Sequence, residues 1–335
     1  MKKVWAGGGL LWAVVCSTPA LADPATGVWD SECRCFRGVT WGPETWFDGS
    51  YRPDGWTFTQ SLDFWPVVRG ATGQPLILWA HPGNGFKEIE VTRNRALPSL
   101  YNKLIIEARR AGFAVGSLDY RHPVQNDDIV PAPHLDVGRA VQSVRAMSVE
   151  LGIDPRNIFL VGVSQGSLGV WQALQEDLMV PGADGPAGQS SRVNAAYAYN
   201  AQVTYRGQET ADRFLVPDDR PAYVAQWLVD HPQDALFGSA LASVVPDSVP
   251  VMLKYEAPYF HRLVSRQELS NHHPDFGLAL CEAYAQQGIA ERCSVLDQVP
   301  KDQDLIGAIP FFLSHFVGTP PRPGLPGTTA PTGAR

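Results

Sequence analysis

Short apolar segments alternate with helix-like segments along most of this chain, and that alternation limits its possible folds more than any other feature. The strand-like segments are residues 75–80, 113–118, 158–163, 193–199, 249–255 and 294–299. The helix-like segments are residues 99–110, 135–151, 167–178, 221–229, 276–287 and 305–316. Strands that alternate with helices form a parallel sheet covered by helices on both faces. The sequence therefore predicts an α/β fold with a mostly parallel central sheet.

The first 22 residues have the pattern of a secretory signal peptide. Lys2 and Lys3 precede an apolar run over residues 4–15, and residues 20–22 (ALA) fit an A-x-A cleavage site. A membrane-spanning helix needs about 20 apolar residues, so this run is too short to cross a bilayer. We expect cleavage near Ala22 and a secreted or periplasmic protein with no membrane span; an uncleaved anchor is the alternative.

Four cysteines follow the predicted signal peptide: Cys33, Cys35, Cys281 and Cys293. An even number of cysteines in an exported protein is typical of disulfide bonds. We favour a bridge between Cys281 and Cys293, because it would tie the helix at 276–287 to the strand after it. Cys33 and Cys35 then form a tight local bridge or remain as free thiols.

The rest of the chain is predicted to be one domain, residues 23–318, with two atypical regions. Residues 23–73 are rich in Trp, Gly and Pro, with short alternating runs such as 56–59, and predict an amino-terminal layer of β-hairpins. Residues 205–246 are irregular around one clear helix and predict a small cap over the carboxyl ends of the strands. Residues 319–335 are too poor in apolar side chains to pack, which predicts a disordered tail.

Composition excludes several classes of protein. The apolar fraction of 44% is sufficient to build a core, so the chain is not disordered. It has 27 Lys and Arg residues against 34 Asp and Glu residues, a net charge of −7, whereas nucleic-acid binding needs basic patches. We find no phosphate-binding loop, dinucleotide fingerprint or metal-ligand spacing, and expect no cofactor and no metal. No pattern indicates an oligomeric state.

One motif carries the clearest chemical signal: residues 162–166 (GVSQG) fit G-x-S-x-G. The motif follows the strand-like segment 158–163 and precedes the helix-like segment 167–178, which is the strand–turn–helix setting that it requires. Its two glycines permit a sharp turn that exposes the Ser164 hydroxyl. The backbone N–H of Gln165 lies at the amino end of the helix, where it can stabilise an oxyanion. The sequence therefore predicts Ser164 as a nucleophile.

With this motif, the sequence resembles the α/β-hydrolase superfamily over roughly residues 74–318, and within it the secreted esterase and feruloyl-esterase-like branch. Residues 78–86 (LWAHPGNGF) look like the family's strand and H-G-G-type oxyanion loop, and residues 112–121 look like its next strand with a D-Y-R ending. Residues 135–158 look like the helix that leads into the nucleophile strand. The resemblance implies the α/β-hydrolase fold and an ester hydrolase.

The loop after residue 80 is implied to form the rest of the oxyanion site. Gly83 and Gly85 let the backbone approach a substrate carbonyl, so that N–H groups of this loop, which includes Asn84, can complete the oxyanion hole with that of Gln165. In this family His81 usually orients the loop, and we do not expect it to be the catalytic base.

The acid and the histidine of the triad are absent from the positions that the family implies. The chain order should be serine, acid, histidine, with the acid after the strand at 249–255 and the histidine after the strand at 294–299. Pro258 falls near the acid position, and Glu256 is the closest carboxylate. Asp304 stands about where the histidine is expected, close to Asp302.

A displaced histidine is the first of three hypotheses. His272 and His273 precede the helix at 276–287, and His261 lies in an apparent insertion before them. Each could reach Ser164 from the rim of the site. Glu256 or Asp275 could orient the imidazole.

The other two hypotheses do without a histidine. Asp304 could replace it, but a carboxylate with a pKa of about 4 is a weak base unless burial or a second carboxylate raises that pKa. Alternatively the triad has been lost, and the protein is a non-catalytic binding protein on a hydrolase scaffold. Our leading hypothesis is a secreted serine hydrolase that cleaves small-molecule or polymer carboxylic esters through an acyl-enzyme on Ser164. An exported peptidase ranks lower, because its usual propeller domain cannot fit in residues 23–73.

Overall fold

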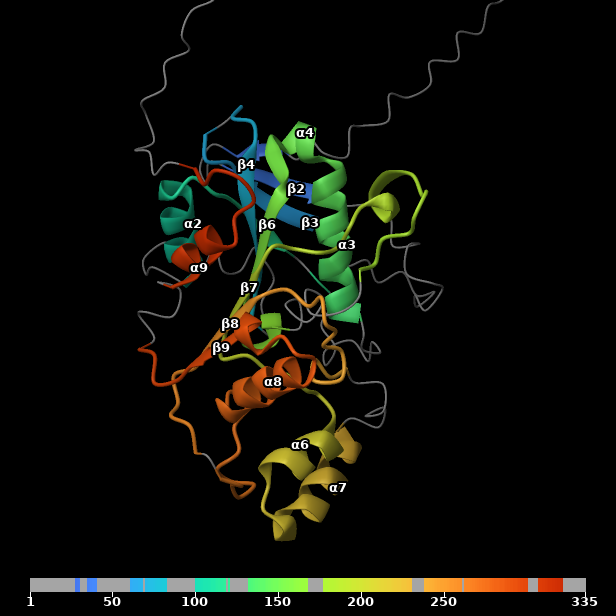
Figure 1. The fold of residues 1–335 in the computed structure, drawn as a ribbon, viewed down its shortest axis with the longest axis vertical. Coiled ribbons are helices and arrows are strands. Elements are labelled where there is room, and N and C mark those ends of the chain that lie inside the picture. The colour runs from blue at the N-terminus through green and yellow to red at the C-terminus, as the bar shows by residue number, and fades with distance from the viewer. Residues whose placement is uncertain are drawn as a thin grey trace, which may run out of the picture.

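A mixed β-sheet runs through the centre of the protein (Figure 1). The structure is a computed structural model that describes residues 28–30, 35–40, 61–68, 70–82, 100–118, 120, 132–167, 177–230, 238–260, 262–300 and 307–321. Within these residues the sheet has nine strands in the order β1-β2-β3-β5-β4-β6-β7-β8-β9. The strands are β1 (Val28–Asp30), β2 (Cys35–Thr40), β3 (Ser61–Trp65), β4 (Gln74–Ala80), β5 (Ala114–Leu118), β6 (Ile153–Val163), β7 (Ala196–Tyr199), β8 (Val251–Lys254) and β9 (Cys293–Leu296).

The sheet has an antiparallel part and a parallel part. β1 pairs with β2, β2 with β3 and β3 with β5, each in antiparallel fashion. From β5 through β4, β6, β7 and β8 to β9, every pair is parallel. The predicted mostly parallel sheet and its amino-terminal antiparallel layer are confirmed. Trp65, in β3, is buried against the main core, whereas the short strand predicted at 56–59 lies outside the described residues.

Helices cover both faces of the sheet (Figure 1). They are α2 (Leu100–Arg110), α3 (Ala132–Ala146), α4 (Ser148–Leu151), α6 (Gly207–Phe214), α7 (Arg220–Asp230), α8 (Asp275–Gln286) and α9 (Ala308–Ser314). Leu76 and Leu78 of β4 pack in the core that α3 and α8 share. Ile77 and Trp79 pack in the core formed with α2 and α9. Successive side chains of a strand point to opposite faces, so one apolar strand supplies both cores.

Two predicted boundaries were wrong for local reasons. The helix predicted at 135–151 is divided at Met147 into α3 and α4, and α4 stops at Gly152, whose φ is 64°. β6 begins at Ile153, earlier than predicted, because Ile153 pairs with Gln74 of β4, ahead of a register shift between Gln74 and Leu76. That shift leaves room for Pro155, which has no N–H to donate to a ladder.

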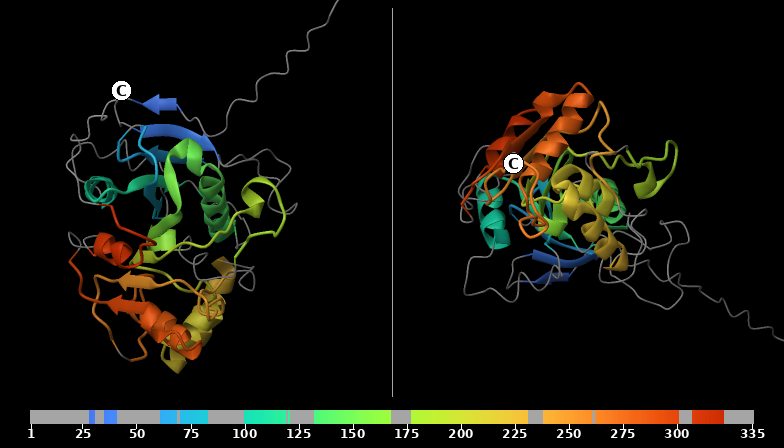
Figure 2. Two further views of the ribbon diagram at one scale, coloured as in Figure 1. Left: turned by 45° about the horizontal axis from the view of Figure 1, so that its top comes forward. Right: turned by 90° about the horizontal axis from the view of Figure 1, so that it is seen from below.

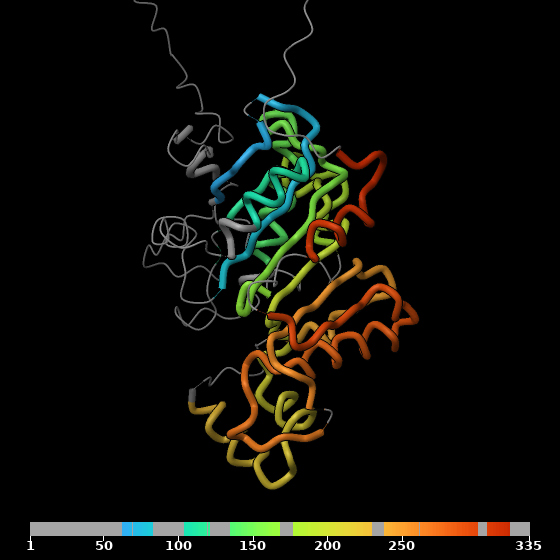
Figure 3. Tube along the Cα trace, turned by 90° about the vertical axis from the view of Figure 1, so that its left-hand side faces the viewer, coloured from blue at the N-terminus to red at the C-terminus, as the bar shows by residue number. Residues whose placement is uncertain are grey.

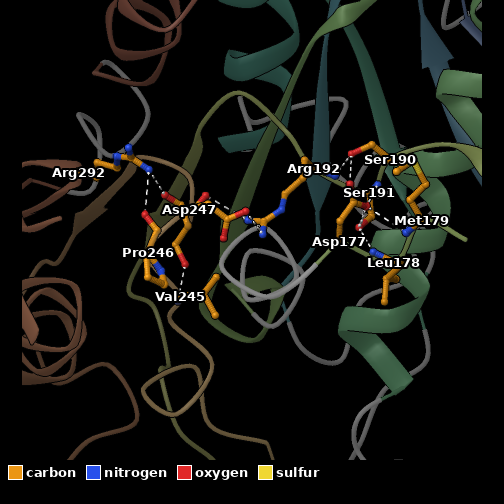
Figure 4. A network of polar contacts seen from close by, with 11 residues as sticks. Asp177, Leu178, Met179, Ser190, Ser191, Arg192, Val245, Pro246, Asp247 and Arg292 are labelled. Atoms are coloured by element: carbon orange, nitrogen blue, oxygen red, sulfur yellow. Dashed lines mark hydrogen bonds and ion pairs between the residues drawn. The ribbon is translucent and has the colours of Figure 1, made fainter. Parts of the chain in front are cut away.

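A polar network fixes the segment that leads from Asp177 into β7 (Figure 4). The Asp177 carboxylate accepts hydrogen bonds from the N–H of Ser191, at 2.7 Å, and from the Ser190 hydroxyl, at 2.5 Å. The half-buried side chain of Arg145, in α3, donates to the carbonyl oxygens of Pro155, Ser190 and Arg192. The Arg145 contacts thus tie α3 and the segment before β7 to Pro155, near the start of β6.

The region predicted to be a cap contains two helices, α6 and α7, and not the single helix expected. Both lie at the lower end of the molecule in Figure 1, beside α8 and at the opposite end from α4. The segment after β8 runs alongside them, as Figure 3 shows in orange and yellow, and Leu215 forms a β-bridge with Val264. Seen from below, the two helices and α8 stand in front of the sheet (Figure 2).

Cys281 of α8 and Cys293 of β9 form a disulfide, with their Cα atoms 5.2 Å apart. This is the bridge that the sequence favoured. Cys33, the predicted signal peptide and residues 322–335 lie outside the described residues, although the tail is described as far as Pro321, which packs against Gly112. In the described part of the chain, no helix is both long enough and apolar enough to span a membrane.

Candidate active site

The predicted nucleophile elbow lies at the carboxyl end of β6. Ser164 begins a 3-10 turn, η2 (Ser164–Gly166), directly after Val163. Its φ is 51°, in the left-handed region that non-glycine residues rarely adopt. Strain of this kind costs about 1–3 kcal/mol and is found mainly where function requires it. The half-buried Ser164 side chain is therefore presented by a strained turn at the edge of the sheet.

Close packing requires both glycines of the motif. A Cβ on Gly162 would lie 2.4 Å from the carbonyl oxygen of Gly166. A Cβ on Gly166 would lie 2.1 Å from the carbonyl oxygen of Ala80, the last residue of the neighbouring strand β4. The turn is pressed against itself on one side and against β4 on the other. Only glycine fits at these two positions.

His272 meets the nucleophile. Its Nε2 lies 2.7 Å from Ser164 Oγ, within hydrogen-bonding distance, although the two residues are 108 positions apart in the sequence. When the imidazole is neutral with its proton on Nδ1, Nε2 accepts the hydrogen bond that the serine hydroxyl donates. Among the candidate bases that the structure describes, His272 is the one that lies against Ser164.

The surroundings of His272 keep its imidazole ready to accept a proton. Burial lowers the pKa of His272, and the nearby carboxylate of Glu256 acts in the opposite direction. A lowered pKa leaves the ring neutral at pH 7, which a general base requires. Glu256 is exposed and lies close enough to stabilise the positive charge that the ring gains on protonation.

Asn200 holds the backbone of Glu256, a role that the sequence did not suggest. Its Oδ1 accepts a hydrogen bond from the N–H of Glu256 at 3.1 Å, and its own N–H donates to the carbonyl of Lys254 at 2.7 Å. Asn200 directly follows β7 and has a φ of 51°. Asparagine is several times more frequent than most residues in this conformation, so an asparagine directly after a strand was the available signal.

The oxyanion side of the site is described in part. His81 is buried; its Nδ1 lies 2.8 Å from the carbonyl oxygen of Pro82, and its ring stacks on Tyr120 with centroids 4.5 Å apart. The Tyr120 hydroxyl also donates to the carbonyl of His81. These contacts fit the expected orienting role of His81, and they add Tyr120, which sequence reasoning had not singled out. Gly83 and Asn84 lie outside the described residues, and Gln165 follows Ser164 at the elbow.

The remaining candidate residues are separated from this contact or undescribed. His273, adjacent to His272, is 1% exposed and packs among phenylalanine rings. Its Nδ1 lies 3.7 Å from Asp275 Oδ2. His261 and Asp304 lie outside the described residues.

The strand predicted at 294–299 is shorter than expected. β9 ends at Leu296, because Gln298 has a φ of 52° and breaks the extended chain. The loop after the strand therefore begins with Asp297, whose carboxylate accepts a hydrogen bond from the N–H of Tyr259 at 3.1 Å. No group of three or more His, Cys, Asp or Glu side chains within the described residues is arranged to hold a metal ion.

Comparison with known proteins finds similarity to ester-cleaving enzymes. Residues 62–197 match the model of the BD-FAE family, an α/β-hydrolase esterase family. This match includes Ser164 and ends before Glu256 and His272. No curated protein sequence matches the chain significantly.

Solved structures share its fold. An acetyl ester-xyloside bifunctional hydrolase from Caldicellulosiruptor lactoaceticus is 18% identical, with a TM-score of 0.55 over 82% of this chain and 94% of that one. Thermogutta terrifontis esterase 2, phosphonylated by sarin, is 18% identical with a TM-score of 0.51 over 77% and 91%. A bifunctional GH43-CE protein of Bacteroides eggerthii is 18% identical with a TM-score of 0.51 over 76% and 36%.

Proposed function

We propose that this chain, whose residues 62–197 match an α/β-hydrolase esterase family and which has the α/β-hydrolase fold, hydrolyses carboxylic esters through an acyl-enzyme on Ser164. His272 is the general base and Glu256 is its acid partner. The 2.7 Å contact between Ser164 Oγ and His272 Nε2 carries this proposal, because a base must lie within hydrogen-bonding reach of the proton that it removes. The chain order of serine, acid and histidine is kept, although the histidine comes from the segment between β8 and α8.

The proposed reaction has two halves. Ser164 Oγ attacks the ester carbonyl carbon while His272 Nε2 takes the hydroxyl proton, and the Glu256 carboxylate stabilises the imidazolium that forms. The N–H of Gln165 donates to the oxyanion of the tetrahedral intermediate. As the intermediate collapses, His272 returns the proton to the leaving alcohol. Water then repeats the sequence on the acyl-enzyme, and the carboxylic acid leaves with Ser164 protonated again.

Short p-nitrophenyl esters test this activity directly. The purified protein should release p-nitrophenol, and Ser164→Ala should remove that turnover, because alanine has no nucleophilic oxygen. The matched control is Ser314→Ala, whose exposed hydroxyl at the end of α9 donates a hydrogen bond to the carbonyl of Phe311.

A fluorophosphonate probe separates an enzyme from a binding protein on the same scaffold, because only an activated serine reacts with it. Labelling of the wild type and of Ser314→Ala, but not of Ser164→Ala, is expected. Absence of both turnover and labelling in the wild type, or turnover that survives Ser164→Ala, would contradict the proposal.

We also propose that the protein acts outside the cytoplasm after cleavage near Ala22. The charged start, the apolar run and the A-x-A site support export, and the Cys281–Cys293 disulfide fits an oxidising compartment. The test is to express the full chain and to measure the mass of the protein recovered outside the cytoplasm. A mass that still includes residues 1–22, or recovery only from the cytoplasm, would contradict export.

A further inference from the structure

His273 directly follows the proposed general base, but its side chain is turned into the protein. It is 1% exposed, and its ring lies 4.8 Å from the ring of Phe260 and 6.4 Å from those of Phe214 and Phe276, between centroids. We call these three phenylalanines the His273 cage. They come from the segment after β8, from the end of α6 and from the first turn of α8.

The ring of His273 accepts a hydrogen bond at the start of α8. Its Nδ1 accepts a hydrogen bond from the N–H of Asp275, the first residue of that helix, at 3.2 Å. Burial lowers the pKa of His273, while the neighbouring Asp275 carboxylate raises it, so the ring stays neutral and Nδ1 remains an acceptor. The proton then resides on Nε2, which is buried and has no hydrogen-bond partner within the described residues.

Filling the core does not explain a histidine at this position. A buried donor without a partner is unfavourable, and a leucine would occupy a similar volume without that penalty. What a leucine cannot supply is the acceptor at Nδ1. The polar function of this side chain is therefore the bond to α8.

The cage and this bond fix the backbone on one side of His272. On the other side, Ser270 accepts hydrogen bonds from the N–H groups of His272, at 3.2 Å to its hydroxyl, and of His273, at 3.2 Å to its carbonyl. The end of α6 is tied to the same segment, because Phe214 accepts a hydrogen bond from the N–H of Val264 at 2.8 Å. His272 thus projects from a short turn whose two ends are anchored.

We propose that His273 is a positioning residue for the ester hydrolysis proposed above: its Nδ1 acceptor and its cage hold the turn that points His272 at Ser164. Through Phe214, helix α6 is part of the same support. His273 itself does not touch the reacting atoms. The proposal rests on the proposed function only for its kinetic consequence, because the placement of His272 can be measured without turnover.

Two substitutions separate positioning from packing. His273→Asn places its Oδ1 where Nδ1 stands and keeps the acceptor, but it leaves part of the cage empty. His273→Leu fills the cage and removes the acceptor. The matched controls are His315→Asn and His315→Leu, which should leave kcat unchanged. The His315 ring packs on that of Phe311, with centroids 4.8 Å apart, and its carbonyl oxygen accepts a hydrogen bond from Asn194, which precedes β7.

A positioning role predicts that activity and stability rank the two variants in opposite orders. A displacement of the base by about 1 Å can cost on the order of 10²-fold in rate, so His273→Leu should lower kcat by that factor with little change in KM. His273→Asn should retain kcat within about tenfold of the wild type while having the lower Tm of the two. A His273→Leu variant with the kcat of the wild type would overturn the proposal.

The imidazole of His272 gives a readout that does not require turnover. Its pKa is measured from imidazole NMR spectra, with the signal assigned by its loss in His272→Asn. His273→Leu should move this pKa toward the ordinary value as the ring leaves its buried place, and His273→Asn should not. If the wild type hydrolyses no ester, the proposed function fails, and this measurement still decides whether His273 holds His272.

A second variant keeps the test decisive if His273→Leu does not fold. Phe214→Leu leaves every acceptor in place but removes part of the cage on the α6 side. It should lower kcat with little change in KM and should move the His272 pKa in the same direction as His273→Leu. A shift in neither quantity would overturn the proposal.

Discussion

Ser164 and His272 meet in one contact, but the protein holds them in different ways. Ser164 belongs to a turn at the end of β6, and backbone atoms of β4 and of the turn itself leave room for nothing larger than glycine at Gly162 and Gly166. His272 lies in the long segment between β8 and α8 and is held by side chains. Ser164 is therefore fixed by the sheet, and His272 by the packing of a loop.

The polar groups on the two sides of the protein also differ. In the network that includes the start of β6 and the segment before β7, Asp177 and Arg145 each make several hydrogen bonds. Beside the base, His273 Nε2 and Asp275 Oδ1 are buried with no hydrogen-bond partner within the described residues. A fully bonded network resists displacement more strongly than a partly bonded one. Substitutions on the base side should therefore change the reaction more readily than they unfold the protein.

Removing the base should have the largest effect on the rate. His272→Gln leaves a polar side chain that cannot take a proton from Ser164. General-base catalysis contributes about 10²- to 10⁴-fold, so kcat should fall by at least this range while the Tm changes little. The matched control is His315→Gln, which should keep full activity. Full activity in His272→Gln would exclude His272 as the base and direct attention to His261.

Gly166→Ala, unlike His272→Gln, should cause a large loss of stability. Its Cβ would lie 2.1 Å from the Ala80 carbonyl oxygen, so the turn or the end of β4 must move. We expect the free energy of unfolding to fall by about 3 kcal/mol, the upper part of the usual range for overpacked sites, with activity also lost. Chemical denaturation measures this change.

The control for that variant is Gly182→Ala, where a Cβ would meet nothing within 4 Å but the φ is 79°. It should cost only the left-handed backbone penalty, about 1–2 kcal/mol, and should retain activity. Equal losses in the two variants would show that the contact with β4 does not constrain the elbow.

The acid partner should have an intermediate effect, visible in the pH profile. Because burial lowers the pKa of His272, the acid limb of kcat/KM should lie below the ordinary histidine value of about 6.5. The Glu256 carboxylate raises that pKa, so Glu256→Gln should shift the limb to still lower pH and reduce kcat. A limb that moves to higher pH, or does not move, would contradict this pairing.

The smallest predicted effect is on stability and comes from the backbone strain at Ser164. Glycine adopts a φ of 51° without strain, so Ser164→Gly should be inactive and yet about 1 kcal/mol more stable than Ser164→Ala, which keeps a Cβ in the same conformation. The difference in Tm between these two inactive variants measures the strain. A Ser164→Ala variant as stable as Ser164→Gly would show that the turn is not strained.

Local patterns predicted the fold and the nucleophile. The alternation of strand-like and helix-like apolar segments predicted the parallel sheet, because the spacing of hydrophobic residues indicates which faces of a strand or helix are buried. G-x-S-x-G between a strand and a helix located Ser164, since the steric demands of that turn involve only neighbouring residues and one strand end. The Cys281–Cys293 disulfide could also be predicted from the sequence, because it joins two consecutive elements, α8 and β9.

The base could not be chosen from the sequence, because His261, His272 and His273 have similar sequence surroundings. Two adjacent histidines point in different directions, and that difference depends on Phe214, Phe260 and Phe276, which three separate elements bring together. The hydrogen bond between Asn200 and the N–H of Glu256 was also out of reach of the sequence, because it joins the ends of β7 and β8, which are distant in sequence.

The sequence by itself thus determined the sheet, the strained turn and the serine on it, because backbone sterics and side-chain periodicity act over short stretches of chain. Only the tertiary structure decided which histidine meets that serine. His272, the partner of Ser164, lies 108 residues away in the sequence. The direction of its side chain depends on which of the two adjacent histidines is buried in the core. The core encloses His273, and His272 is thereby left to face the nucleophile.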